Sequence, residues 1–183
     1  GSREMLISLP RYDFNWQRTY GFTAPVILAA EGSRYVAPVA PQLVLGLSSS
    51  GVNAADLMLI HGGISAPPLP DISFSLGATN NVIYPLTNPR KTTLTFSAAK
   101  GTFTGGFTLE DTDPLDLRPP PAVLRKIQRK STFNGVLVRD TAGEWKGVGT
   151  FQLPELPDVT GETLTTTPVH VGEVQILPAT AVP

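Results

Sequence analysis

The sequence predicts an all-β protein, either an antiparallel β-sandwich or a partly open β-barrel of about nine or ten strands with little helix. Three observations lead to this prediction. Apolar and polar residues alternate with a period of two in many short segments, and almost nowhere with the period of a helix. Glycine (17) and proline (18) are frequent among the 183 residues, so turns are many. Charged residues are only 16% of the chain, and Thr and Ser are abundant, as on the outer face of a sheet.

The segments that we expect to form strands are each bounded by turn-forming residues. In chain order they are Glu4–Leu9, Tyr12–Gln17, Gln42–Leu47, Asp56–His61, Asp71–Leu76, Thr92–Ala98, Thr102–Leu109, Ser131–Arg139, Trp145–Leu153 and Val169–Leu177. The best helical candidate, Pro121–Lys130, is too short to be stable without packing. We expect one domain over residues 1–183, in which the opening Gly1-Ser2 is typical of residues left by cloning.

The clearest alternation lies in Thr92–Leu109. Leu94 and Phe96 share one face of the first arm, and Phe103 and Phe107 share one face of the second. A Lys100-Gly101 turn separates the two arms. The pattern therefore predicts a β-hairpin whose four large apolar side chains point inward.

A short repeat follows the same logic. The run Thr102-Phe-Thr-Gly-Gly-Phe107 recurs as Thr132-Phe-Asn-Gly-Val-Leu137, and Gly149-Thr-Phe151 keeps part of the pattern. In both copies the phenylalanine stands two residues before a glycine, so the two share a strand face. Glycine inside a strand leaves a gap that a ring can cover. We expect rings of neighbouring strands to fill these gaps.

The segment Glu110–Lys130 begins acidic and ends basic, with three successive prolines, 119–121, between the two. We expect an excursion from the sheet, more mobile than the flanking strands, in which acids face bases across a long hairpin. Asp111, Asp113 and Asp116 are calcium candidates, because calcium takes six to eight oxygen ligands from a flexible loop. The EF-hand pattern is missing, so a solvated turn or pairing with the basic residues of Arg125–Lys130 is favoured.

The sequence offers little catalytic chemistry. Ser48 and Ser50 lie in a glycine-flanked run that misses the Gly-x-Ser-x-Gly spacing of a nucleophile elbow. His61 and His170 are the two histidines, more than a hundred positions apart, and cysteine is absent. We therefore expect no enzyme, no cofactor and no metal site, and a serine hydrolase around Ser48–Ser50 and His61 is the least favoured alternative.

Aromatic residues suggest a second possible function. Tyr12, Phe14 and Trp16 alternate with Asp, Asn and Gln, which on a strand separates rings from polar groups. If exposed, Tyr12, Trp16 and Trp145 would be stacking platforms of a carbohydrate-binding module. If buried, they are core residues, which is the favoured interpretation because aromatic rings dominate sheet packing.

Charge and hydropathy limit the partners. The formal net charge is −1, and the isoelectric point is about 6.1. This balance predicts no nucleic-acid partner and no footprint for an anionic membrane. Membrane insertion is not expected either, because no run of about 20 apolar residues is present. The absence of cysteine fits a secreted bacterial protein.

The order of motifs in the second half of the chain carries a resemblance. These motifs are Leu94-Thr-Phe96, the Gly101–Phe107 run, the Arg129–Val138 run, Gly147–Pro154 and the closing Val169–Leu177 segment. They resemble a module near the C-terminus of long, repeat-rich secreted or surface proteins of verrucomicrobia-type bacteria. The resemblance implies a non-enzymatic structural or adhesive module of a larger extracellular or cell-surface protein. Its partners would be neighbouring domains, other surface proteins or polysaccharide.

Overall fold

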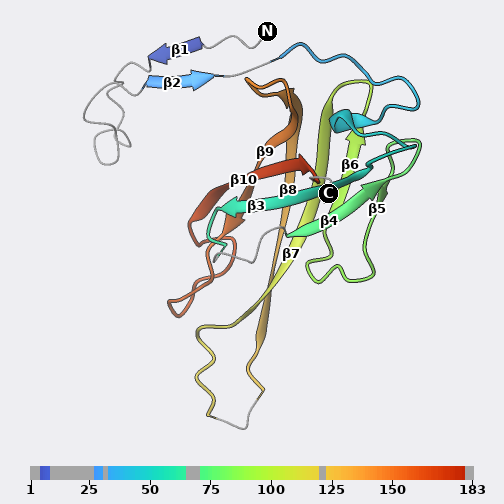
Figure 1. Ribbon diagram of the computed structural model, residues 1–183. Helices are drawn as coiled ribbons and strands as arrows, with labels where there is room; N and C mark the ends of the chain where they lie inside the picture. The colour runs from blue at the N-terminus through green and yellow to red at the C-terminus, as the bar shows by residue number, and fades with distance from the viewer. Residues whose placement is uncertain (1–4, 9–26, 31–32, 65–70, 120–122, 180–183) are drawn as a thin grey trace. The chain divides into compact units, whose positions relative to one another are not determined.

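The computed structural model describes residues 5–8, 27–30, 33–64, 71–119 and 123–179, and these residues form an all-β structure (Figure 1). Its elements are β1 (Met5–Ser8), β2 (Ile27–Ala30), the 3-10 turn η1 (Val44–Gly46), β3 (Ala54–His61), β4 (Ile72–Leu76), β5 (Val82–Ile83), β6 (Thr93–Ser97), β7 (Thr102–Thr112), β8 (Lys126–Arg139), β9 (Trp145–Pro154) and β10 (Val169–Pro178). The fold class and the approximate strand number predicted from the sequence are confirmed. No helix among the described residues has the length and hydrophobicity needed to cross a bilayer.

Contacts between residues divide the chain into two compact units. The first comprises Gly1–Arg34 and Arg139–Glu144, and in it β1 and β2 pair antiparallel from Met5↔Ala30 to Ser8↔Ile27. The second comprises Tyr35–Val138 and Trp145–Pro183 and holds the other eight strands that the structure describes.

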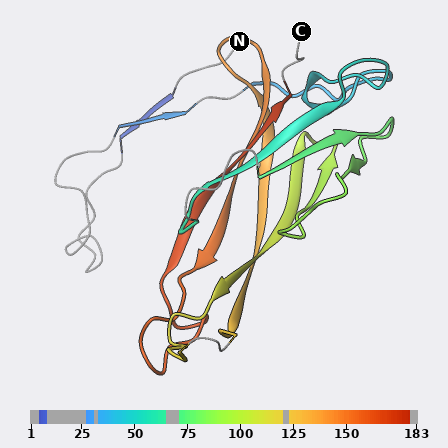
Figure 2. The same ribbon diagram turned by 60° about the horizontal axis from the view of Figure 1, so that its bottom comes forward.

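The eight strands of the second unit form one antiparallel sheet in the order β5-β4-β3-β10-β9-β8-β7-β6, curled into a nearly closed barrel (Figures 1 and 2). Tyr84 links the two edges, because its hydroxyl accepts the Leu94 N–H at 2.6 Å and donates to the Leu94 carbonyl at 3.2 Å. Burial raises the pKa of Tyr84, which keeps this hydroxyl protonated. The side chain thus satisfies backbone groups of β6 that would otherwise form an open edge.

The hairpin predicted over Thr92–Leu109 is confirmed. Strands β6 and β7 pair from Thr93↔Gly106 to Ser97↔Thr102. Leu94, Phe103 and Phe107 are at most 5% exposed, and Phe96 is half-buried against the core. The turn has four residues, 98–101, rather than the two that the sequence suggested, and the N–H groups of residues 100 and 101 both bond the Ser97 carbonyl.

The two Phe-x-Gly repeats pair with each other. The antiparallel register of β7 and β8 places Phe103 opposite Gly135, and Gly105 opposite Phe133. A Cβ atom built on Gly135 would lie 2.3 Å from the Phe103 ring, and one on Gly105 would lie 2.3 Å from the Phe133 ring. Each ring therefore occupies the space that the opposite glycine leaves empty. The expected filling of glycine gaps by neighbouring rings is confirmed, and the antiparallel register makes it reciprocal.

The third ring extends this packing into the next pair of strands. Phe151 of β9 lies opposite Gly172 of β10, where a Cβ atom would come within 2.0 Å of the ring. Phe151 also meets Phe107 edge to face, with ring centroids 5.2 Å apart. Aromatic rings over glycines thus hold β7, β8, β9 and β10 together on the core face.

One predicted strand is wrong. Gln42–Leu47 forms a single bridge, Gln42↔Ser48, around the 3-10 turn η1. Leu43, Val44, Leu45 and Leu47 are all at most 4% exposed. A strand would turn alternate residues of this run to opposite faces, whereas a tight turn can bury consecutive residues. Leu45 adopts a positive φ of 61° to do so.

The predictions between residues 110 and 130 need correction. The helical candidate Pro121–Lys130 forms no helix in its described part, because Lys126 to Lys130 belong to β8 and pair with β7 as far as Lys126↔Thr112. Among the described residues, the excursion from the sheet therefore comprises only 113–119 and 123–125. Cross-strand pairing outweighs the weak helix propensity of such a short segment. The sequence also missed the short strands β2 and β5, while Tyr12–Gln17 lies outside the described residues.

Candidate functional site

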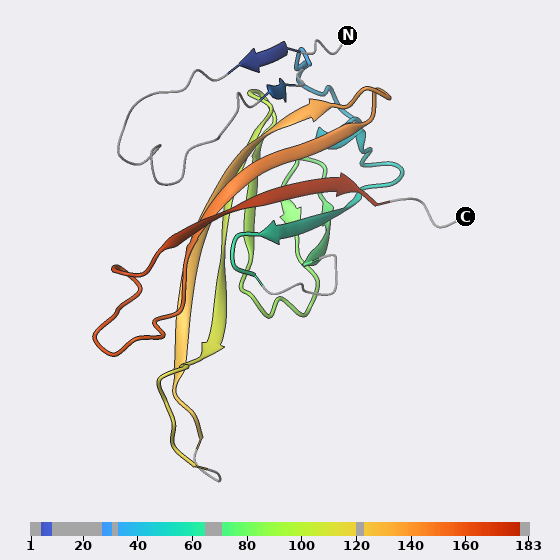
Figure 3. The ribbon, with the colours of Figure 1, turned by 90° about the vertical axis from the view of Figure 1, so that its left-hand side faces the viewer.

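Strands β7 and β8 continue past the other strands of the barrel and form a long projecting hairpin (Figures 1 and 3). We call residues 110–119 and 123–130 the arm. The pairing of β6 with β7 stops at Gly106, so no strand in the described part of the chain pairs with the arm on that side. Its two strands must therefore be held together mainly by contacts with each other.

At the base of the arm, the inward face changes from apolar to charged. Leu109 is buried, and the next residue on that face, Asp111, pairs with Arg129 at 2.8 Å. Arg129 is only 5% exposed and donates a second hydrogen bond, of 2.9 Å, to the Pro154 carbonyl. A buried guanidinium with two acceptors avoids the desolvation cost of an unpaired charge.

The next level of the arm is centred on Asp113. Its side chain is 2% exposed, pairs with Arg125 and accepts the Leu115 N–H at 2.9 Å. The Asp113 N–H also donates to the Arg125 carbonyl at 2.9 Å. This backbone bond extends the ladder beyond Thr112↔Lys126, while Lys126 Nζ donates to the Thr112 hydroxyl at 3.0 Å.

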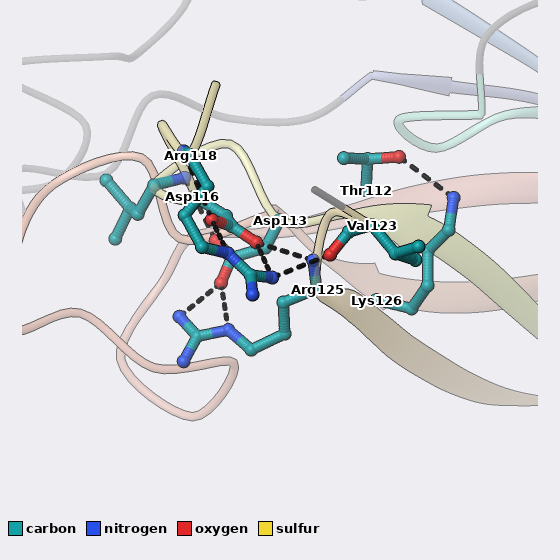
Figure 4. A network of polar contacts seen from close by, with 8 residues as sticks. Thr112, Asp113, Asp116, Arg118, Val123, Arg125 and Lys126 are labelled. Atoms are coloured by element: carbon teal, nitrogen blue, oxygen red, sulfur yellow. Dashed lines mark hydrogen bonds and ion pairs between the residues drawn. The ribbon is translucent and has the colours of Figure 1, made fainter. Parts of the chain in front are cut away.

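The far level joins the two sides of the excursion (Figure 4). Arg118 forms a bidentate pair with Asp116, at 2.7 and 2.6 Å, and donates to the Val123 carbonyl at 2.8 Å. Asp116 in turn accepts the Arg125 N–H at 2.5 Å. The Arg118 guanidinium holds the pKa of Asp116 well below its usual range. We call this set of contacts the neck of the arm.

We call residues 113–119 and 123–126 the distal arm. In it the acidic side chains are buried and the cationic side chains are exposed. The side chains of Asp113 and Asp116 are 2% and 7% exposed, whereas those of Arg118 and Arg125 are 55% and 69% exposed. Beside them two aliphatic side chains point into solvent, Leu117 at 88% and Val123 at 84% exposed. The surface near the end of the arm is therefore aliphatic and cationic.

The three calcium candidates Asp111, Asp113 and Asp116 are each paired with an arginine. The pairing expected with Arg125–Lys130 is confirmed for Asp111 and Asp113, and Arg118 is an additional partner. Among the described residues no group of three or more His, Asp or Glu side chains could hold a metal ion. The carboxylates therefore act here as arginine partners that hold the hairpin together.

The hydrolase candidates lie in separate local contacts. The Ser48 hydroxyl contacts the Ser50 hydroxyl at 3.1 Å. His61 is exposed at the end of β3, and His170 of β10 pairs with Glu155. In the described parts of the chain, neither serine hydroxyl is hydrogen-bonded to a histidine, so no nucleophile–base pair is formed there.

Of the three aromatic candidates for sugar stacking, only Trp145 lies in the described part of the chain. It is half-buried against the core and meets Tyr35 edge to face, with centroids 5.7 Å apart. A Cβ atom on Gly46 would come within 2.8 Å of the indole. The Cδ1 edge of the indole is thus occupied by the chain itself. Tyr12 and Trp16 lie outside the described residues.

A polar hollow of about 520 Å³ lies over β8 and β9. Its lining is mostly hydroxyl and amide side chains, together with one lysine: Lys130, Ser131, Thr132, Asn134, Thr150, Phe151 and Gln152. The Ser131 hydroxyl donates to the Gln152 carbonyl at 2.8 Å and links the two strands there. Such a lining can exchange hydrogen bonds with a polyhydroxylated ligand.

The sequence did not single out Leu117, Arg118 or Val123 as functional residues. The only signal was their place in a charged, proline-rich segment without strand alternation, which predicts a loop but not what its side chains do. The outward Asn134 and Gln152 of the hollow were likewise not distinguished from other polar strand residues. Comparisons of the chain with protein-family models, curated proteins and solved structures found no match.

Proposed function

We propose that this chain is a non-catalytic structural or adhesive module of a larger extracellular or cell-surface bacterial protein. The barrel is the scaffold, and the arm is the element that contacts a partner. The observation that carries this proposal is the arm itself, a projecting hairpin braced by ion pairs at three levels, with exposed aliphatic side chains beside the last one.

The bracing supports a role that needs a defined shape. A two-stranded hairpin is marginally stable in water on its own. Here Arg129 joins the two strands through Asp111 and ties them to β9 through the Pro154 carbonyl. Asp113 and Asp116 each accept hydrogen bonds that join the two strands or tie the loop to them. Charge-assisted, bidentate bonds are among the stronger polar contacts in proteins. The arm can therefore present the same surface to a partner each time.

The exposed side chains support a role in contact. Single exposed aliphatic residues are common on protein surfaces. Leu117 and Val123, however, are more than four-fifths exposed. Arg118, which follows Leu117 in the chain, donates a hydrogen bond to the Val123 carbonyl and holds the two residues near each other. Neither side chain packs in the barrel core. Contact with a partner is therefore the best explanation for apolar side chains at these exposed positions.

The test is to shorten the arm without disturbing the barrel. Because Thr112 and Lys126 are a cross-strand pair, an Asn-Gly turn in place of residues 113–125 closes the hairpin at that point. Beads carrying the full chain should attach to intact bacterial cells, and beads carrying the shortened chain should attach no better than uncoated beads. Far-UV circular dichroism of both proteins controls for folding. Equal attachment of both chains, or none by the full chain, would contradict the proposal.

The non-catalytic part has its own test. The full chain should not turn over chromogenic ester, peptide or glycoside substrates. Activity abolished by His61→Ala, with circular dichroism unchanged, would overturn this part of the proposal and favour the hydrolase alternative.

Carbohydrate binding is the second candidate function, favoured by the hydroxyl- and amide-lined hollow over β8 and β9. In that case, calorimetric titration of the full chain with soluble polysaccharides should give a heat of binding. The Asn134→Ala/Gln152→Ala variant should give none. Retention of the heat by this variant would exclude the hollow as the site. The shortened-arm chain should bind normally, which separates this candidate from the first.

A further inference from the structure

The distal arm presents charges that the composition of the chain does not reveal. The protein as a whole has a net charge of −1. In residues 113–119 and 123–126 there are two acids, Asp113 and Asp116, and three cations, Arg118, Arg125 and Lys126. The acids are covered and the cations are exposed. The solvent-facing charged side chains of this part are therefore all cationic.

The arginines retain donors for a further partner. Arg118 uses Nε and Nη2 for Asp116 and Val123, and Arg125 uses Nε and Nη2 for Asp113. In the described structure the Nη1 groups of both make no such bond. An oxygen-rich anion such as a phosphodiester could accept from them without breaking the neck.

The aliphatic side chains lie on the two sides of the same neck. Leu117 precedes Arg118 directly, and Val123 is bonded to Arg118 through its carbonyl. Both are held next to exposed cations, so apolar and cationic groups share one end of the arm. This combination is typical of surfaces that lie in a membrane interface, with apolar groups among the acyl chains and cations at the phosphates.

We propose that the end of the arm binds the surface of lipid bilayers that contain anionic phospholipids. This inference rests on the proposed role of the arm as the contact element. An acidic polysaccharide could satisfy the cations but offers no apolar phase for Leu117 and Val123. A stable protein interface buries roughly 1,200–2,000 Å² in total, which is more than two aliphatic side chains and a neck can supply. A bilayer needs only shallow insertion and anionic headgroups.

Vesicle co-sedimentation tests the proposal. The full chain should bind vesicles of phosphatidylcholine with phosphatidylglycerol more strongly than vesicles of phosphatidylcholine alone, and added salt should reduce the difference. Leu117→Ser/Val123→Ser should weaken binding to the mixed vesicles by about tenfold. The matched control, Val136→Ser/Val171→Ser, removes two aliphatic side chains that are 48% and 63% exposed on the barrel. It should bind as the unmodified chain does.

A spectroscopic measurement reports insertion directly. The chain has no cysteine, so Leu117→Cys and Val136→Cys each create a single site for an environment-sensitive dye. The dye at position 117 should shift to the blue when mixed vesicles are added, and the dye at position 136 should not. No shift at position 117, or equal shifts at both positions, would overturn the proposal.

The outcomes separate this inference from the proposed function. If cells capture the full chain through the arm but mixed vesicles do not bind it, the bilayer proposal is wrong and the contact role stands. If protease treatment of the cells then abolishes capture, the partner is a protein. If vesicles bind through Leu117 and Val123 but cell attachment does not depend on the arm, the adhesive role is wrong.

Discussion

The two halves of the β7–β8 hairpin are built on the same pair of strands but are held together by different forces. In the barrel half, Phe103 and Phe133 cover the glycines of the opposite strand and are at most 2% exposed. In the arm half, Asp111, Asp113 and Arg129 take inward positions, and charge-assisted bonds pair Asp111 with Arg129 and Asp113 with Arg125. The change occurs just after Leu109, near the end of the apolar core.

This difference teaches where each force is effective. Ring-over-glycine packing requires a closed apolar interior, because its stabilisation comes from area removed from water. In the described part of the arm, the inward face holds paired charges around the half-buried Ile127, so directional polar bonds carry most of the contact between the two strands. We therefore expect substitutions that reduce side-chain volume to destabilise the barrel half. Substitutions that remove a side-chain charge should destabilise the arm half.

The largest effect should follow from Phe103→Ala. The ring is 1% exposed and covers Gly135, so its removal leaves a cavity that the glycine cannot fill. We expect the free energy of unfolding to fall by about 3–5 kcal/mol, measured by urea denaturation followed by circular dichroism. Thr104→Ala, on the outward face of the same strand, is the control and should change it by less than about 0.5 kcal/mol. A small fall in the free energy of unfolding for Phe103→Ala would mean that ring packing is not the main stabilisation of the barrel half.

An intermediate effect should follow from Arg129→Met, at the boundary of the two halves. Methionine keeps much of the side-chain volume but removes the donors to Asp111 and to the Pro154 carbonyl. We expect a loss of about 1–3 kcal/mol in the same denaturation experiment. Lys130→Met, one residue on and exposed, should be nearly neutral. If Arg129→Met proved stabilising, desolvation of the charges would outweigh their pairing at this position.

The smallest effect on global stability should come from the neck. The pKa of Asp116 is lowered in the folded chain, first by its bond to Arg118. Its contribution is therefore complete above the ordinary aspartate pKa of about 4 and is lost as the pH falls through the lower folded value. A carbon-13 NMR titration should place the Asp116 midpoint below about 4, and Arg118→Gln should move it back towards that value.

Urea denaturation of an Asp116 variant tests whether the two halves of the hairpin unfold separately. Asp116→Asn should leave the urea midpoint of the barrel almost unchanged, because the neck lies outside the cooperative core. An ordinary midpoint for Asp116 in the unmodified chain would show that the bidentate pair does not persist in solution. A large fall in barrel stability for Asp116→Asn would show that arm and barrel unfold as one unit.

Local alternation was sufficient to predict most of the strands. The period-two pattern of Leu94, Phe96, Phe103 and Phe107 determined which faces would be buried, because side chains in a strand alternate whatever their neighbours are. The Phe-x-Gly repeats likewise placed ring and gap on one face. The acid-to-base order of Glu110–Lys130 predicted ion pairing across a hairpin. In each case the property belongs to a few consecutive residues.

Tertiary structure decided what depends on partners distant in the chain. The consecutive burial of Val44 and Leu45 follows from the surrounding core and overrode a strand pattern. The reciprocal fit of the rings required the register of β7 on β8. Closure at Tyr84 and the exposure of Arg118 over a covered Asp116 likewise depend on residues meeting in space. Composition shows how many charges the chain carries, but only packing decides which of them face solvent, since burial is a property of the folded surroundings.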